Sequence, residues 1–343
     1  MTTEQARLPE EEGVRIMVCV KRCFQECVCC LVIIGAATVL SSAASGASDA
    51  RESSSGSITI SAGDLTVTFV DNEAHGKEHR AGYNGIARLT HAKQSENVFV
   101  PAYAGFNLEH IFGGDAMPDL FEPRHHPMRL QRLSATAVEL RQSPTPRSSV
   151  ESTTRFTVVP PHYVDIEFRC VARDLGFFRH GYMGLFWASY IHAPEDRRVH
   201  FLGRGPGDGA SRWIVAESAK HGEASTHRGV SDPGEVFFAP DFNATLASHF
   251  SEWRFSEPFF CGRFRNMILI YMFDRAGEIR FSQSPNGGGE TNPAWDFQFL
   301  ARNVRAGTPY GFRARVAYKP FVGFDDAAGE FRRWRGQLPS SEK

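Results

Sequence analysis

Residues 178–209, FRHGYMGLFWASYIHAPEDRRVHFLGRGPGDG, place a strongly apolar segment between a histidine-bearing turn and a glycine-rich loop. In an extended chain, Leu185 and Trp187 would point to one side of this segment and Phe186 to the other. A strand that is apolar on both faces is typical of the interior of a β-protein. We therefore predict a buried strand here, at the centre of a β-rich fold.

Strand signals continue on both sides of this segment. Residues 58–69 alternate apolar and polar side chains around an Ala-Gly-Asp turn, which predicts a β-hairpin. Further strands are predicted at residues 97–103, 128–134, 137–143, 154–160, 163–172, 199–203, 212–218, 235–240, 244–250, 267–273, 278–284, 296–304 and 310–321. Because no β–α alternation accompanies them, we predict an all-β fold, a large antiparallel β-sandwich.

The end of the chain follows a different period. Four side chains keep near-helical spacing there: Phe324, Ala328, Phe331 and Trp334. This spacing predicts a short C-terminal helix. The apolar fraction of 42% and the 28 Phe residues suit a large core, and 38 basic against 39 acidic side chains give no field that would attract nucleic acid.

The N-terminal region has the layout of a targeting segment. An apolar run follows Lys21 and Arg22, is too short for a comfortable membrane span, and ends in small residues, so residues 1–47 are predicted to be a signal peptide. Met17 is an alternative start, and an uncleaved anchor is an alternative to cleavage. Residues 48–57 are predicted to be a flexible spacer and residues 58–343 a single β-sandwich domain, with two fused sandwiches as the alternative.

The chain has seven cysteines, of which five lie in the first 30 residues and are assigned to the targeting segment. The other two are Cys170 and Cys261, both in predicted strands. Export to the periplasm or the extracellular space would permit a disulfide between them. Two buried free thiols fit the pattern equally well.

Two polar segments of the first half carry candidate ligand-binding groups. NEAHGKEHRAGYNGI contains Arg80 and Asn84, which can donate hydrogen bonds to ligand hydroxyls. AGFNLEHIFGGDAMPDLFEPRHHPMRL, residues 104–130, contains Glu109, His110 and Arg124 in a long predicted loop, and such loops are disproportionately functional. No HxH or HExxH spacing occurs, so neither a metal nor another cofactor is predicted.

Two later segments complete the candidate site. His180 stands where a loop becomes a strand, and Arg204 lies in the glycine-rich loop that follows. In SPNGGGETNPAWDFQF, Glu290, Trp295 and Asp296 combine an aromatic face with two carboxylates, which is a mixture that suits sugar recognition. A hairpin loop with its Trp in the core is the alternative interpretation of this last segment.

Three of these segments resemble the galactose mutarotase-like supersandwich superfamily, which includes aldose epimerases and accessory domains of carbohydrate-active enzymes. They are HRAGYNGIARL, RHGYMGLFWASYIH and GGGETNPAWDFQF. The resemblance implies a supersandwich fold, with His180 as the acid that protonates the ring oxygen of a sugar and Glu290 as the base that removes the anomeric proton. It also implies that Arg80 and Asn84 bind sugar hydroxyls, and the same role is predicted for His110, Arg204, Trp295 and Asp296.

The sequence therefore predicts an exported carbohydrate-active protein that binds a saccharide and acts on it by His/Glu acid–base chemistry. One alternative is a non-catalytic sugar-binding or cell-surface module. Another is a glycoside hydrolase or polysaccharide lyase that uses paired carboxylates, such as Glu109 with Asp115 or Glu290 with Asp296.

Overall fold

The structure of the protein is a computed structural model that describes residues 56–73 and 82–339. The chain divides into two units, Met1–Arg51 and Glu52–Lys343, and all described residues belong to the second. The predicted signal peptide and most of the predicted spacer lie outside the described residues, as does Arg80. Within the described residues, no helix is long and apolar enough to span a membrane.

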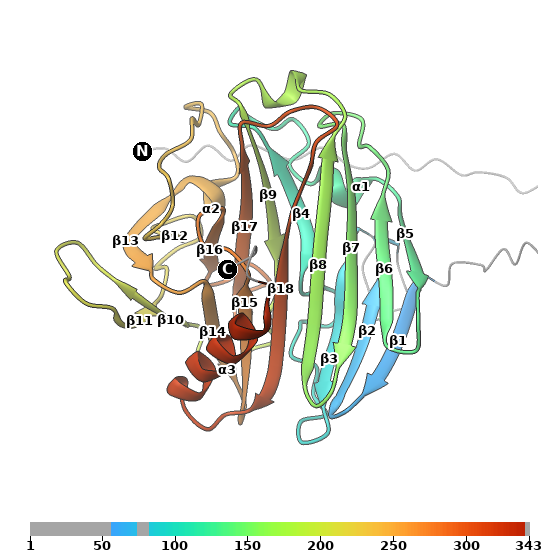
Figure 1. Cartoon of the computed structure of the whole chain (residues 1–343), viewed down its shortest axis with the longest axis vertical. Coiled ribbons are helices and arrows are strands. Elements are labelled where there is room, and N and C mark those ends of the chain that lie inside the picture. Colours follow the sequence, from blue (N-terminus) through green and yellow to red (C-terminus); the bar gives the residue numbers. More distant parts are fainter. Residues whose placement is uncertain (1–55, 74–81, 340–343) are drawn as a thin grey trace, which may run out of the picture. The chain divides into compact units, whose positions relative to one another are not determined.

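The described part of the chain forms a three-stranded sheet and a fifteen-stranded sheet (Figure 1). The three-stranded sheet consists of β1 (Ser57–Ala62), β2 (Leu65–Val70) and β3 (Gly85–His91). The predicted hairpin of residues 58–69 is confirmed, because β1 and β2 pair antiparallel with Ala62 opposite Leu65. The predicted all-β sandwich is confirmed as well.

The fifteen-stranded sheet folds over into two layers. The first layer contains, in order, β4 (Asn107–Phe112), β9 (Tyr182–Ala188), β17 (Ala294–Arg302), β16 (Ile279–Ser284) and β12 (Thr226–Gly229). The strands β13 (Phe250–Phe255) and β10 (Val199–Arg204) connect the layers, and β11 (Arg212–Ala216) pairs with β10. The second layer contains β14 (Phe259–Phe264), β15 (Met267–Phe273), β18 (Pro309–Pro320), β8 (Tyr163–Ala172), β7 (Val150–Val159), β6 (Ala137–Gln142) and β5 (Met128–Arg132).

One consequence of this order is that β4 and β5, neighbours in sequence, are the two terminal strands of the ladder. The segment between them includes α1 (Glu122–His125). Two further helices are α2 (Thr245–Ser248) and the predicted C-terminal helix, which is confirmed as α3 (Phe324–Gln337). A 3-10 turn, Gly176–Phe178, precedes β9.

The main core lies between the two layers. Trp187 of β9 stacks on Phe297 of β17 with ring centroids 4.9 Å apart, and Phe312 of β18 meets Trp187 edge-on at 5.3 Å. A second apolar cluster covers the other face of β9 and contains Phe186 and Tyr190. The predicted alternation of β9, with apolar side chains on both faces, is therefore confirmed. The face of the first layer that points away from the main core, where Phe186 and Tyr190 lie, is the one on which loops build the candidate site.

Three predicted strands are not found. Residues 97–103 form only isolated bridges, at Phe99 and Ala102, and the Asn97 side chain bonds to the backbone of Leu89 and Ala87 where a ladder would run. Residues 235–240 run without a partner strand, with Phe238 packed inward and Phe237 51% exposed. Residues 244–250 divide between α2 and the start of β13.

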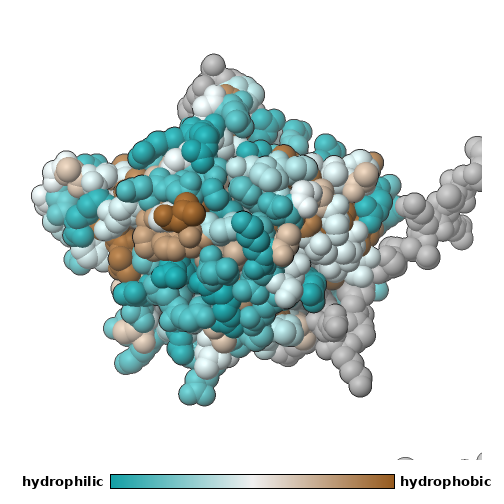
Figure 2. Space-filling model, turned by 90° about the horizontal axis from the view of Figure 1, so that it is seen from below, coloured by the Kyte–Doolittle hydropathy of each residue, from teal (hydrophilic) through white to brown (hydrophobic). Residues whose placement is uncertain are grey.

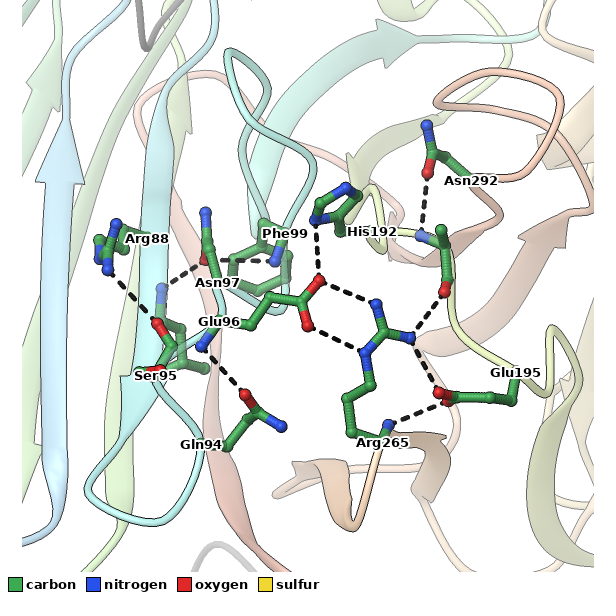
Figure 3. Close-up of polar contacts among 12 residues, drawn as sticks. Arg88, Gln94, Ser95, Glu96, Asn97, Phe99, His192, Glu195, Arg265 and Asn292 are labelled. Carbon is green, nitrogen blue, oxygen red and sulfur yellow. Dashed lines mark hydrogen bonds and ion pairs between the residues drawn. The ribbon is translucent and has the colours of Figure 1, made fainter.

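An arginine joins the loop after β3 to the turn between β14 and β15 (Figure 3). Arg265 Nε and Nη2 donate to the two carboxylate oxygens of Glu96 at 2.9 and 2.8 Å, and Nη1 donates to Glu195 and to the Ala193 carbonyl, both at 2.9 Å. The His192 imidazole lies 3.6 Å from Glu96. A bidentate guanidinium of this kind fixes the relative geometry of the segments it joins.

The two cysteines of the described sandwich are free and buried. Cys170 lies in the main core, and the Cys261 thiol donates to the His200 carbonyl at 3.6 Å. Burial raises the pKa of both thiols. Of the two alternatives that the sequence left open, the structure therefore has the free thiols.

Candidate functional site

Two ionisable residues, Glu109 and His110, are adjacent in the middle of the buried strand β4. Leu108 pairs with Trp187 and His110 with Phe186, so Glu109 is an extra residue in the ladder. Such a β-bulge changes the direction of side chains and is common beside active sites. Glu109 and His110 are each only 5% exposed. Two ionisable groups are therefore held inside the protein next to one another.

The Glu109 carboxylate has four polar neighbours. Oε2 accepts hydrogen bonds from the Tyr190 hydroxyl and, at 3.1 Å, from Asn107 Nδ2. His110 Nε2 lies 3.3 Å from Oε1, and Arg124 Nη1 lies 3.6 Å from Oε2. Burial raises the pKa of Glu109, but the hydrogen bonds from His110 and Tyr190 and the charge of Arg124 outweigh it, so the pKa is lowered. Glu109 is therefore ionised at neutral pH. We call Glu109 and its four polar neighbours, Asn107, His110, Arg124 and Tyr190, the Glu109 cluster.

The hydrogen bonds of His110 define where its protons lie. Nδ1 is 2.6 Å from the Leu120 carbonyl, which can only accept, so Nδ1 carries a hydrogen. Nε2 faces the ionised Glu109 carboxylate, which also only accepts. Both ring nitrogens of His110 thus face hydrogen-bond acceptors, and a hydrogen on Nε2 would lie between His110 and Glu109. An imidazole and a carboxylate in such contact are suitable partners for general acid–base chemistry.

Aromatic rings surround the Glu109 cluster. The ring centroids of Tyr83, Tyr103 and Tyr190 lie 4.8 to 5.7 Å apart. The Arg124 guanidinium lies 3.9 Å from the Tyr83 centroid, and its Nε donates to the Gly82 carbonyl at 3.2 Å. Aromatic faces beside fixed polar groups provide both the stacking surface and the hydrogen bonds that a hydroxylated ring needs.

Asp296 of β17 contributes a second carboxyl group whose pKa shifts in the opposite direction. Its Oδ1 accepts from the Ser189 amide at 2.9 Å, and Oδ2 has no hydrogen-bond partner among the residues described. Burial raises the pKa of Asp296 well above its usual value, and the negative charge of Glu109 raises it further. Asp296 is fully buried, and so it supports the site from within.

Loops from the second half of the chain cover this face of the first layer. The Gln298 side chain of β17 donates to the Ala247 carbonyl of α2 at 3.3 Å. His221 is exposed, its Nδ1 lies 2.9 Å from the Ser284 hydroxyl, and it interacts electrostatically with Glu109. Although the residue is exposed overall, neighbouring groups partly desolvate its imidazole and lower the pKa of His221. This imidazole lies within electrostatic range of the buried Glu109 carboxylate.

Asn84, predicted to bind a ligand, instead holds β4 in place. Its Nδ2 donates to Asn107 Oδ1 at 3.1 Å and to the Leu108 carbonyl at 3.0 Å, and its Oδ1 accepts from the Leu108 amide at 3.0 Å. Asn84 is 1% exposed. The side chain is thus a positioning group for the bulge that presents Glu109.

The structure does not bring His180 and Glu290 together. His180 precedes β9 next to Tyr182, and Glu290 precedes β17, whose first residue Ala294 bridges to Tyr190. The two residues thus flank opposite ends of one antiparallel pair. The strand between Tyr182 and Tyr190 alone spans about 26 Å, which exceeds the size of one sugar ring. His180 pairs instead with Asp115 at 3.1 Å.

The remaining predicted residues are also separated. Trp295 lies in the main core, with its indole Nε1 donating to the Arg197 carbonyl at 3.0 Å, so the core alternative for its segment is the one found. Arg204 is exposed at the end of β10, and Glu290 is exposed in a turn. Of the residues predicted to contact a ligand, His110 and Asp296 lie at the Glu109 cluster.

Sequence reasoning missed the three tyrosines of the site. They come from three separate segments of the sequence: Tyr83, Tyr103 and Tyr190. All that these segments share is a tyrosine next to or near Gly, Asn or Ala, which is too common a pattern to predict a site. Tyr190 lies just beyond β9, which ends at Ala188, and its backbone forms an isolated bridge with Ala294. Glu109 and Arg124 were noticed as members of a polar loop, but the bulge that turns Glu109 inward has no sequence signature.

No protein-family model matches the chain, and a search of curated proteins gives no match. The structure weakly resembles galactose mutarotase-like aldose 1-epimerases. One similar structure is a putative aldose 1-epimerase from Escherichia coli K12, with 9% identity, 77% of this chain and 99% of that chain covered, and a TM-score of 0.46. Another is the galactose mutarotase related enzyme from Lactobacillus acidophilus, with 7% identity, 78% and 100% covered, and a TM-score of 0.46. A heparan sulfate lyase HepC mutant from Pedobacter heparinus has 9% identity, 78% and 36% covered, and a TM-score of 0.42.

Proposed function

We propose that the protein binds a saccharide at the Glu109 cluster and acts on it by acid–base chemistry. The observation that carries this proposal is the buried, ionised Glu109 beside His110 and within a wall of three tyrosines. Tyrosine rings would stack on the apolar face of a sugar, and Arg124 and Asn107 would bind its hydroxyls. The former assignment of the acid and base to His180 and Glu290 is replaced by this pair.

The proposed chemistry uses a hydrogen on Nε2 of His110, next to the Glu109 carboxylate. When a sugar oxygen approaches Nε2, His110 donates that proton, and the Glu109 carboxylate accepts a proton from a neighbouring hydroxyl. In an aldose, protonation of the ring oxygen and removal of the anomeric hydroxyl proton break the bond between the ring oxygen and C1. Ring closure on the other face of the carbonyl then gives the second anomer.

Two assays on the same protein test this function. Polarimetry would follow the interconversion of anomers for a panel of aldoses, and chromatography would follow cleavage of a panel of polysaccharides. Glu109→Gln keeps the shape of the side chain but removes its charge, so we expect turnover to fall by at least about a hundredfold, the usual contribution of a general acid or base. Binding of the same sugar, measured by calorimetry, should weaken much less.

Matched variants distinguish this site from the earlier assignment. Glu290→Gln and His180→Gln change a glutamate and a histidine that lie away from the Glu109 cluster. Both variants should keep turnover within about twofold of the parent value. Loss of turnover in these two variants, with full activity in Glu109→Gln, would contradict the proposal. A parent protein that binds a sugar without converting it would identify a binding module.

A second candidate function is favoured by the opposite pKa shifts of Glu109 and Asp296. Glycoside hydrolases use two carboxyl groups whose environments move their pKa values apart. In that case the polysaccharide panel gives new reducing ends, and the aldose panel gives no change. Asp296→Asn, which stays neutral, should then lower hydrolysis, whereas it should leave anomer interconversion by His110 and Glu109 largely intact.

We also propose that the sandwich acts outside the cytosol, in the periplasm or the extracellular space. This proposal rests on residues 1–47, where a short apolar run follows Lys21 and Arg22 and ends in small residues. N-terminal sequencing of the mature protein tests it. A new N-terminus near Ala44 or Ala47 supports cleavage, whereas an intact Met1 or Met17 in the soluble cytosolic fraction would contradict export.

A further inference from the structure

The β1–β2 turn, the β7–β8 turn and the last residue of β3 lie at the lower end of the sandwich in Figure 1, and Figure 2 shows that the surface at this end is predominantly hydrophilic. Three ionisable side chains that the proposed function does not use converge there. Asp64 lies in the turn between β1 and β2, His91 ends β3, and His162 lies in the turn between β7 and β8. His91 Nε2 is 3.6 Å from Asp64 Oδ2, and His162 Nδ1 is 4.0 Å from the same oxygen. One ligand atom from each residue lies within 4.8 Å of the other two.

We propose that Asp64, His91 and His162 bind a divalent transition-metal ion of the zinc class. Two imidazole nitrogens and one carboxylate oxygen are ligands that Zn²⁺, Co²⁺ and Ni²⁺ prefer. Around Zn²⁺, such atoms lie about 3.4 Å from one another, so the observed spacing needs only a small contraction. The Asp64 side chain is 46% exposed, which leaves the remaining coordination position open to water.

The backbone holds the three residues in this arrangement. The Asp64 amide donates to the Pro161 carbonyl at 2.7 Å, next to His162, and the Ala92 amide, next to His91, donates to the Asp64 carbonyl at 2.8 Å. The turn at Gly63 has φ +59°, and a Cβ atom there would lie 2.4 Å from the Pro161 carbonyl oxygen. The two turns are therefore in direct contact, and the geometry of the three ligands is fixed before any ion binds.

A carboxylate also lies near the far nitrogen of His162. The Nδ1 of His162 faces Asp64, while its Nε2 lies 4.0 Å from Glu330 Oε1, which is longer than a hydrogen bond, and has no hydrogen-bond partner among the described residues. A carboxylate on the far nitrogen of a ligating imidazole orients the ring and raises its basicity. Glu330 is itself held by Tyr163 at 2.9 Å and Lys319 at 2.6 Å.

His91 supplies the second independent observation. It is only 4% exposed, and its Nε2, which is directed toward the other two residues, has no hydrogen-bond partner within the described part of the chain. The Lys93 amide donates to His91 Nδ1 at 3.0 Å, so the hydrogen of the neutral ring is on Nε2. When an ion binds Nε2, the hydrogen of the neutral ring moves to Nδ1. The hydrogen bond from the Lys93 amide to Nδ1 is then lost, and this amide, which lies in an exposed turn, bonds to water instead.

Cobalt and zinc titrations of the tag-free, chelator-treated full-length protein test this site. Because the N-terminal cysteines can also bind such ions, the measurement is the difference in bound Co²⁺ between the parent and its variants. We expect His162→Gln and Asp64→Asn each to lose one equivalent of Co²⁺, detected by its visible absorption and displaced by Zn²⁺. Zn²⁺ should also raise the melting temperature of the parent by several degrees more than that of either variant.

The chain offers a matched control for a surface histidine paired with an aspartate. His125 lies 2.9 Å from Asp119 and is exposed, so His125→Gln should keep the full equivalent. Far-UV circular dichroism establishes that each variant is folded, and His162 and Asp64 are chosen because both lie in turns. Equal Co²⁺ stoichiometry and equal zinc-dependent stabilisation in the parent and in both folded variants would overturn the proposal.

Discussion

Tyr190→Phe removes one hydrogen bond from the buried Glu109 carboxylate and changes little else. A hydrogen bond to a charged group contributes about 1.5–3 kcal/mol. Asn107, His110 and Arg124 still surround the carboxylate in the variant. We therefore expect a loss near the lower end of this range, about 2 kcal/mol in the free energy of unfolding at about pH 7, measured by urea denaturation.

The dependence of this loss on pH tests whether Glu109 is ionised. The folded-state pKa of Glu109 is lowered, so its interactions stabilise the protein above the unfolded pKa of about 4.3 and are lost as the pH falls through the folded pKa. The difference between parent and variant should thus stay constant from about pH 8 to about pH 5 and shrink only below about pH 4. A difference that declines between about pH 7 and pH 5 would refute our conclusion that hydrogen bonding outweighs burial.

A second tyrosine provides the control for this experiment. Tyr318 is fully buried, and its hydroxyl has no hydrogen-bond partner among the described residues. Tyr318→Phe removes a hydroxyl from the same kind of environment without removing a bond to a carboxylate. We expect it to be neutral or slightly stabilising at every pH. A loss as large as that of Tyr190→Phe would show that the effect is not specific to Glu109.

Three other changes test the packing. Gly262→Ala would place a Cβ atom 2.2 Å from the Trp295 ring, so we expect a loss of about 1–3 kcal/mol in urea denaturation, whereas Gly209→Ala, with open space around it, should be nearly neutral. Arg265→Ala, which removes both carboxylate contacts of a half-buried guanidinium, should cost about 1 kcal/mol and less in high salt, as thermal unfolding at two salt concentrations would show. Cys261, whose thiol pKa is raised by burial, should resist alkylation in the native protein and react after denaturation, as mapped by mass spectrometry.

The features that sequence predicts well here are those that depend on local period. The hairpin of residues 58–69, the two-faced strand around Trp187 and the helix from Phe324 each follow from side-chain spacing, and each is present. The failures have a common cause. At residues 97–103 and 235–240 the apolar pattern is real, but a strand also needs a partner, and the partner's position depends on tertiary structure.

The candidate site was harder to predict for a related reason. His110 and Asp296 were selected because of residue type, and both lie at the Glu109 cluster. Trp295, one residue away from Asp296, belongs to the core, because successive residues of a strand face opposite sides. The structure places His180 and Glu290 apart, because two segments that suit one site can flank opposite ends of an antiparallel pair.

The position of β4 and β5 at the two ends of one continuous ladder bears on how the protein assembles. The segment between them must travel from one edge strand to the other, and it carries Arg124, whose contact is Glu109 on β4. The Arg124–Glu109 contact spans only 15 residues and can form before the ladder is complete, whereas Tyr190, which also contacts Glu109, lies 81 residues further along the chain. The complete Glu109 cluster therefore requires long-range strand pairing, so competence for ligand binding would arise late in folding, and a bound sugar would stabilise the closed sandwich.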